Sequence, residues 1–164
     1  MQKQTNDIQS LIDHGFLLLV AGKYNKAEEL FLKAQAKRPS NPTPFIAFAH
    51  AAQLKNDNNL SLKRWKLAYD KFPDNLLILK GLGNIYLELK NLEEGSNYLI
   101  EAQKLEATSN KVMYEYIENG NKLLQAGDPA KAEEVFIEAQ MKWPDKLAPF
   151  HAHHRLLETN RRNS

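Results

Sequence analysis

The chain has 164 residues, a formal net charge of +2 and no cysteine. This length predicts a single domain, and so small a net charge excludes the strong field that draws proteins to nucleic acid or anionic membranes. Without cysteine there is no disulfide, zinc–thiolate site or thiol nucleophile, which fits a reducing compartment. The apolar run Phe16–Ala21 is too short for a signal peptide or a membrane span. The sequence therefore predicts a cytoplasmic protein without a membrane span.

The first half of the chain predicts two pairs of helices after a polar segment over residues 1–6. The first pair is expected over residues 7–20 and 25–37, with Asn25 as the cap of its second helix and Glu28 and Glu29 in the first turn. The second pair opens at Asn41, where a capping residue is followed by Pro42 at the first helical position. Its turn is the polar segment over residues 55–59.

The second half predicts two further pairs. The third pair follows residues 73–75, and Asn91 with Glu94 predicts a capping box before its second helix. The fourth pair turns at Asp128 and Pro129, again a cap followed by proline. Extra residues around Ser109 separate these two pairs by close to one helical turn. We expect either that the first helix of the fourth pair begins a turn early or that the connecting loop bulges.

A last, ninth helix is expected over residues 147–160, without a partner helix after it. His154 lies where the earlier pairs have glycine or alanine. A small residue is needed there only if another helix packs closely. We therefore expect the array to stop at this helix, which would act as a polar-faced cap.

Small and bulky residues recur along the whole chain at a nearly constant interval. Alanines lie at intervals of 34, 34 and 37 residues, at Ala34, Ala68, Ala102 and Ala139. A bulky residue comes three positions before each of them, at Phe31, Trp65, Leu99 and Phe136. A small residue comes nineteen positions before each of them, at Gly15, Ala49, Gly83 and Gly120. Small side chains let two helices approach closely, and large ones fill the space between them.

Prolines five residues after these alanines are expected to stop the second helix of each pair, because proline lacks an N–H group and clashes with the preceding turn. They are Pro39, Pro73 and Pro144, while the third position is Ala107. The first and fourth pairs are also alike in sequence, with KAEELFLKAQAKRP in one and KAEEVFIEAQMKWP in the other. This likeness indicates an old duplication or equivalent roles at the two ends.

This pattern resembles the tetratricopeptide repeat (TPR) family, whose motif runs L-G-x-x-Y, then A-x-x-x-F, then P. Residues 82–86 match the first part, and residues 27–31 and 132–136 match the second. The resemblance implies an all-α, right-handed α-solenoid of four helix pairs with a C-terminal capping helix, forming one domain over residues 1–164. The units are expected at about 8–41, 42–75, 76–109 and 113–146, and the cap at 147–160.

In this family the first helix of each pair lines a concave surface that binds other proteins. Carried to this sequence, that implies a groove lined by Ile12, Phe16, Leu19, Ile46, His50, Gln53, Leu54, Lys80, Asn84, Leu87, Tyr114, Ile117, Asn121, His151 and Arg155. The lining is apolar toward the N-terminal end and polar toward the middle. One interpretation is a groove for an amphipathic helix or an extended peptide. The alternative is that these apolar residues are core, or are covered by residues 1–7.

Lys80, Gly83 and Asn84 resemble the opening of the clamp with which co-chaperones of this family hold a C-terminal carboxylate. The clamp also needs an asparagine in the next unit and basic residues in the unit after. Glu118 lies at the first of these positions, and Ala148 and Ala152 lie at the others. The default interpretation is therefore an ordinary solvated pair of lysine and asparagine.

The segment over residues 151–154 holds three histidines, of which His151 and His154 share a helix face. A metal site needs a third ligand, and no partner is indicated nearby. The sequence contains no P-loop, no G-x-S-x-G and no H-E-x-x-H. We therefore expect no metal, no cofactor, no nucleic-acid partner and no enzymatic activity.

Three functions remain open at this point. The first is a scaffold whose groove binds a peptide or an amphipathic helix of another protein. The second is a small secretion or assembly chaperone that holds an apolar substrate. The third is a regulatory module of a bacterial glycosyltransferase or polysaccharide system, which residues 65–74 resemble. Homo-oligomerisation through the last helix or the groove is compatible with all three.

Overall fold

The computed structural model describes the backbone of residues 2–162 and the side chains of residues 7–158 and 161. Every regular element in residues 2–162 is an α-helix. The eight helices are α1 (Gln2–Val20), α2 (Tyr24–Lys37), α3 (Thr43–Leu54), α4 (Asn58–Lys71), α5 (Leu76–Glu88), α6 (Leu92–Gln125), α7 (Pro129–Lys142) and α8 (Leu147–Arg162). The chain divides into two compact units, Met1–Leu105 and Glu106–Ser164, with the border inside α6. No helix in the described part of the chain is long and apolar enough to cross a membrane.

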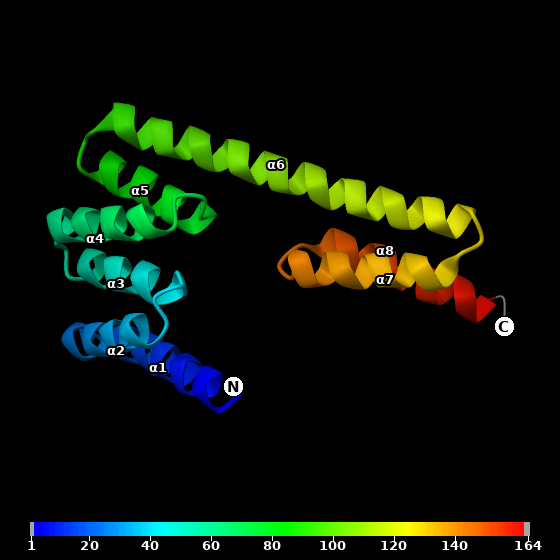
Figure 1. The fold of residues 1–164 in the computed structure, drawn as a ribbon. Helices are drawn as coiled ribbons and strands as arrows, with labels where there is room; N and C mark the ends of the chain where they lie inside the picture. Colours follow the sequence, from blue (N-terminus) through cyan, green and yellow to red (C-terminus); the bar gives the residue numbers. More distant parts are fainter. Residues whose placement is uncertain (1, 163–164) are drawn as a thin grey trace. The chain divides into compact units, whose positions relative to one another are not determined.

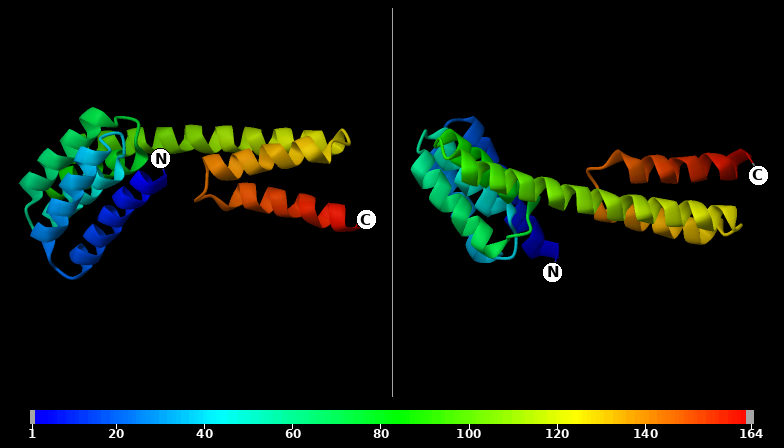
Figure 2. Two further views of the ribbon diagram at one scale, coloured as in Figure 1. Left: turned by 60° about the horizontal axis from the view of Figure 1, so that its bottom comes forward. Right: turned by 90° about the horizontal axis from the view of Figure 1, so that it is seen from above.

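In the first unit, helix hairpins stack in chain order from α1–α2 through α3–α4 to α5 and the first part of α6 (Figures 1 and 2). Each second helix packs against the first helix of the next hairpin. The recurrent alanines are buried in the core: Ala34 and Ala68 are fully buried, and Ala102 is 1% exposed. The expected all-α stack of helix pairs is confirmed.

Close approach at the small residues is confirmed as well. A methyl group on Gly15 would overlap the ring of Phe31, and one on Gly120 would overlap the ring of Phe136. Trp65 is fully buried and belongs to the same core cluster as Ala49, the small residue at the corresponding position of its pair. A Cβ on Gly81 would lie 2.6 Å from the Cζ2 atom of Trp65, so Gly81 also makes room for the indole. A Cβ on Gly83 would lie 2.6 Å from Leu99 Cγ, as the repeat pattern predicts.

The connection between the third and fourth pairs differs from both expectations. Helix α6 runs without a break over 34 residues, so neither a loop nor a bulge separates the two pairs, and the described residues form eight helices instead of the nine expected. The physical reason is at residue 107, where alanine takes the place of the proline that follows the helix in the other pairs. Alanine is the best helix former, so nothing local stops the helix there.

Four expected helix starts can be compared with the structure. Asp128 accepts a hydrogen bond from the backbone N–H of Lys131, as expected of a cap. Asn91 lies 3.5 Å from the backbone N of Glu94 at the start of α6. Asn41 accepts from the backbone N–H of Thr43, but the N-cap of α3 is Pro42, so this helix begins one residue later than expected.

The expectation for Asn25 is wrong. Helix α2 begins one residue earlier, at Tyr24, and its N-cap is Lys23, which makes no capping hydrogen bond with its side chain. Helix α1 also begins earlier than expected, at Gln2, within the segment taken from the sequence as a polar lead-in.

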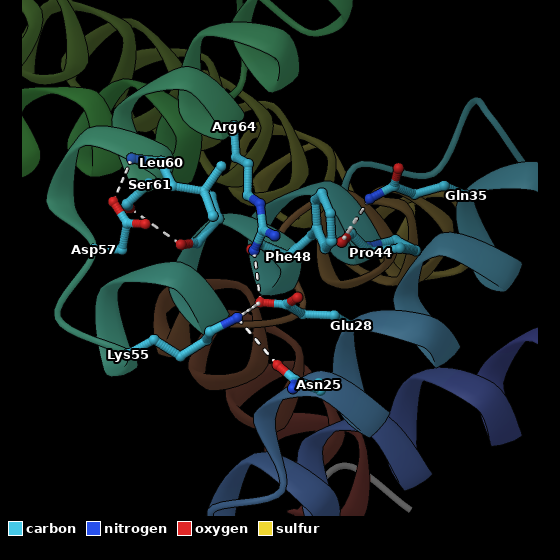
Figure 3. Close-up of polar contacts among 11 residues, drawn as sticks. Asn25, Glu28, Gln35, Pro44, Phe48, Lys55, Asp57, Leu60, Ser61 and Arg64 are labelled. Carbon is cyan, nitrogen blue, oxygen red and sulfur yellow. Dashed lines mark hydrogen bonds and ion pairs between the residues drawn. The ribbon is translucent and has the colours of Figure 1, made fainter.

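A partly buried polar cluster joins the first two hairpins (Figure 3). Arg64 on α4 donates to Glu28 on α2 at 2.9 Å and to the carbonyl oxygen of Phe48 on α3 at 2.8 Å. Lys55 lies 3.4 Å from the same Glu28 oxygen and donates to Asn25 at 3.1 Å. These contacts connect three consecutive helices, so they oppose sliding of one hairpin on the next.

The second unit consists of the latter part of α6 with α7 and α8. Its core is a cluster made by Met113, Ile117, Ala132, Phe136, Ala152 and Leu156. Trp143, just after α7, donates its indole N–H to Ser109 Oγ at 2.9 Å. Lys146 lies 3.4 Å from Glu106. Both contacts involve side chains of α6 in the segment where a loop was expected. The continuous helix fixes the positions of these side chains.

Candidate functional site

Three first helices of hairpins, α1, α3 and α5, are neighbours in the first unit, because α1 contacts α3 and α3 contacts α5. Several of their side chains are exposed or half-buried and repeat at the same positions along the helices. We call this set the α1–α3–α5 face. Its residues are Phe16, Val20, His50, Gln53, Leu54, Asn84 and Glu88.

The apolar part of this face comes from α1 and α3. Val20 is 90% exposed, Leu54 is 50% exposed and Phe16 is 42% exposed. The ring of Phe16 packs edge-on against the buried ring of Phe31, with centroids 5.5 Å apart. Phe31 therefore fixes the orientation of the Phe16 ring, and the exposed edge of that ring stays accessible to a partner.

The polar part of the face is tied together by hydrogen bonds. Gln53 donates to Glu88 Oε1 at 2.8 Å, which links α3 to α5. His50 packs edge-on against the buried indole of Trp65, with ring centroids 4.9 Å apart. Burial lowers the pKa of His50, although a hydrogen bond with Gln53 acts in the opposite direction. An imidazole, an amide and a carboxylate thus lie next to the apolar residues.

Several predicted lining residues are core residues. Ile12 is 2% exposed and packs with Ile8 and Ala34. Leu19 and Ile117 are 9% and 8% exposed and belong to the cores of the first and second units. The interpretation of the apolar positions as core therefore holds for these three, which do not line a surface. The side chains of residues 1–6, which were the other possible cover, lie outside the described residues.

Two further predicted residues lie between surface and core. Ile46 is half-buried and packs against the cluster around Trp65 and Phe45. Leu87 is half-buried and lies against α6, since a Cβ on Gly95 would be 2.7 Å from its Cδ2 atom. Both contribute more to packing between helices than to an open face.

The resemblance to a carboxylate clamp finds no support in the packing of the second unit. Lys80 is half-buried and Asn84 is exposed on α5. The positions that would carry the basic residues are Ala152, which is 2% exposed, and Ala148, which packs against the same core. Neither alanine can bind a carboxylate through its side chain.

The remaining predicted residues belong to the second unit. Tyr114 on α6 is 60% exposed, His151 and Arg155 on α8 are exposed, and Asn121 is half-buried. His153 points inward, with its Nδ1 atom 3.1 Å from Gln140 Nε2 and its Nε2 atom 3.5 Å from Glu133 Oε1. Among the described side chains, no three histidine or acidic residues are arranged to hold a metal ion.

A shallow depression of about 370 Å³ lies elsewhere, between α1 and α2. It is lined by His14, Leu18, Lys23, Lys26, Glu29 and Leu30. None of the predicted lining residues belongs to it. It is open and mixed in character, and it has no converging polar groups of the kind that define a small-molecule site.

Comparisons with known proteins place the fold. No protein-family model matches the sequence, and no curated protein matches it significantly. The structure is similar to PilF of Pseudomonas aeruginosa, with 22% identity, a TM-score of 0.58, and coverage of 98% of this chain and 72% of that one. It is also similar to SycD, the type III secretion translocator chaperone of Yersinia enterocolitica, with 14% identity, a TM-score of 0.56, and coverage of 84% and 94%.

A third similarity is to a thermophilic TPR protein of Thermus thermophilus, with 22% identity, a TM-score of 0.45, and coverage of 93% of this chain and 82% of that one. The interval of 34 residues, the close packing at the recurrent small residues and the first two structural similarities lead to one conclusion. The chain has the tetratricopeptide-repeat fold.

Proposed function

We propose that the chain is a non-enzymatic interaction protein and that the α1–α3–α5 face binds a segment of another protein. The observation that carries this proposal is the exposure of Val20, Leu54 and Phe16 on neighbouring, mutually packed helices. Adjacent exposed apolar side chains beside fixed polar groups are typical of protein-binding surfaces. Gln53 and Glu88 supply those polar groups.

The chain offers a matched pair of residues for the test. Leu54 is 50% exposed on the proposed face, and Leu67 is 45% exposed on α4, outside it. Aspartate at either position removes similar apolar surface and adds the same charge. A difference in binding between the two variants is therefore due to the position of Leu54 on the α1–α3–α5 face, and not to the lost apolar surface or the added charge.

The experiment is a selection of binding peptides from a random display library with the wild-type chain as bait. We expect Leu54→Asp to lose the selected peptides and Leu67→Asp to keep them, with both variants retaining their helicity by circular dichroism. Equal binding by Leu54→Asp and the wild type would contradict the proposal. Phe16 and Ile46 are less suitable sites for substitution, since both contact buried aromatic residues.

A second candidate is a chaperone that holds an export or assembly substrate, and the similarity to SycD favours it. The two functions differ in what happens to the partner alone. A photo-crosslinker at residue 54 would identify the partner in cells, and the partner would then be expressed with and without this chain. A partner that is insoluble alone and soluble with the chain supports a chaperone, and one that is soluble alone supports a scaffold.

Two further parts of the sequence-based interpretation are also proposals. Tyr114, His151 and Arg155 form a proposed second contact surface on the second unit. The regulatory role in a polysaccharide system rests on the sequence resemblance of residues 65–74 alone.

A further inference from the structure

The helices α1, α3 and α5 end at equivalent residues of the repeat. The first two of these residues are apolar and the third is acidic. The last residues are Val20, Leu54 and Glu88, each 34 positions after the one before. Val20 is 90% exposed, Leu54 is 50% exposed and Glu88 is exposed. The ends of three neighbouring helices thus present two apolar side chains followed by a carboxylate.

The spacing of these side chains limits what can contact all three. Helices in direct contact have axes about 8–10 Å apart. Helix α1 contacts α3, α3 contacts α5, and the hydrogen bond from Gln53 to Glu88 joins the last turns of α3 and α5. A polyproline II segment advances about 3.1 Å per residue and has three residues per turn, so every third side chain points the same way at intervals of about 9 Å. Such a segment matches the spacing between neighbouring helices with side chains at positions i, i+3 and i+6.

The carboxylate of Glu88 selects the third side chain of the ligand. Its Oε1 atom accepts a hydrogen bond from Gln53 at 2.8 Å, which restricts the rotation of the side chain. A basic side chain makes a charge-assisted hydrogen bond with a carboxylate held in this way. Lys55, which follows Leu54, is directed toward Glu28 and Asn25 on α2. Lys90 lies in the turn after Glu88 and moderates the local charge, so the apolar pair supplies most of the affinity and Glu88 the selectivity.

We propose, on the basis of the proposed function, that the partner segment is extended and carries two apolar residues and one basic residue at every third position. The apolar residues contact Val20 and Leu54, and the basic residue pairs with Glu88. The chemistry is the same for either chain direction of the bound segment.

The probes are two fluorescein-labelled peptides, Leu-Pro-Pro-Leu-Pro-Pro-Lys and its reverse, with matched peptides in which lysine is replaced by glutamate. Binding to the full chain is measured by fluorescence anisotropy at low salt. We expect at least one lysine peptide to bind, and Leu54→Asp to weaken it about tenfold or more. Leu67→Asp is the matched control and should leave the affinity unchanged.

The charge is tested by a swap. Glu88→Lys should weaken the lysine peptide about fivefold and strengthen the glutamate peptide by a similar factor. Glu88→Gln keeps an acceptor for Gln53 and removes the charge, so it separates the ion pair from the hydrogen bond. Glu101→Lys, an exposed change of the same kind on α6, should leave both affinities unchanged.

The outcomes separate this inference from the proposed function. If Leu54→Asp abolishes binding but lysine and glutamate peptides bind the wild type equally, the face binds protein and the inferred selectivity is wrong. If neither peptide binds while the display selection yields ligands of another pattern, the inference is again wrong and the proposed function stands. If the selection itself is insensitive to Leu54→Asp, both are overturned.

Discussion

Arg64 and Glu28 form an ion pair with an N–O distance of 2.9 Å between the second helices of two consecutive hairpins. Their side chains are 11% and 14% exposed, so most of the pair is removed from water. The guanidinium group of Arg64 also lies 3.6 Å from the centre of the Phe48 ring. Burial raises the pKa of Glu28, but the hydrogen bonds and charges of Arg64 and Lys55 outweigh it, and the net pKa lies below its ordinary value.

Removing the arginine should destabilise the first unit. Arg64→Met keeps the apolar stem and leaves the Glu28 carboxylate with Lys55 alone, so we expect a loss of about 2 kcal/mol in the free energy of unfolding. Urea denaturation followed by circular dichroism measures it. As a control, Lys131→Met removes the exposed pair with Asp128, whose lysine side chain is 70% exposed, and should change little. Similar losses in both variants would show that burial of the pair adds nothing.

Stability should rise with pH through the titration of His50. Its folded pKa is lowered by burial from an ordinary value of 6.5. The unfolded chain therefore binds the proton more readily, and the contribution of His50 is present above pH 6.5 and is lost as the pH falls below it. Replacing His50 by glutamine should flatten this part of the curve of unfolding free energy against pH. An unchanged slope between pH 5 and 7 would refute the assignment to this histidine.

A methyl group at Gly120 should cost stability despite favouring the helix. Alanine at this position would gain about 1 kcal/mol in helix propensity, but its Cβ would overlap the ring of Phe136. Overpacking in a core costs about 1–3 kcal/mol, so we expect a net loss in chemical denaturation. In the double variant Gly120→Ala with Phe136→Leu, the losses should be less than additive because the smaller side chain makes room. Strict additivity would mean that the two residues do not interact.

Proline at position 107 should disrupt the continuous helix α6. Ala107→Pro restores the residue type found after the helix in the other pairs, removes one backbone hydrogen bond and introduces a clash with the preceding turn. Inside a helix such a change costs about 3 kcal/mol or more. Circular dichroism and urea denaturation should show reduced helicity and stability, while Ala107→Ser should cost less than 1 kcal/mol. A harmless proline would indicate that the helix need not be continuous at this point.

Features that depend on neighbours in sequence could be predicted well. The caps at Asp128 and Asn91 use a side-chain oxygen and a backbone N–H three residues away, so the local sequence contains the whole interaction. Recurrent alanines predicted buried helix contacts because only small residues permit close packing, and Ala34, Ala68 and Ala139 are fully buried. Asn25 failed as a cap because the helix begins one residue earlier, a shift that propensities do not resolve.

The sequence by itself determined the repeat and the type of fold, since the interval between small and bulky residues specifies how hairpins nest. Only the tertiary structure decided which apolar residues of the first helices reach the surface: Ile12 and Phe16, one turn apart on α1, are 2% and 42% exposed. Tertiary packing also brought Arg64 to Glu28 and Gly81 to Trp65. The physical reason is that the burial of a side chain and its long-range partners depend on which residues of the neighbouring helices lie opposite it. The spacing of residues along the sequence does not specify those residues.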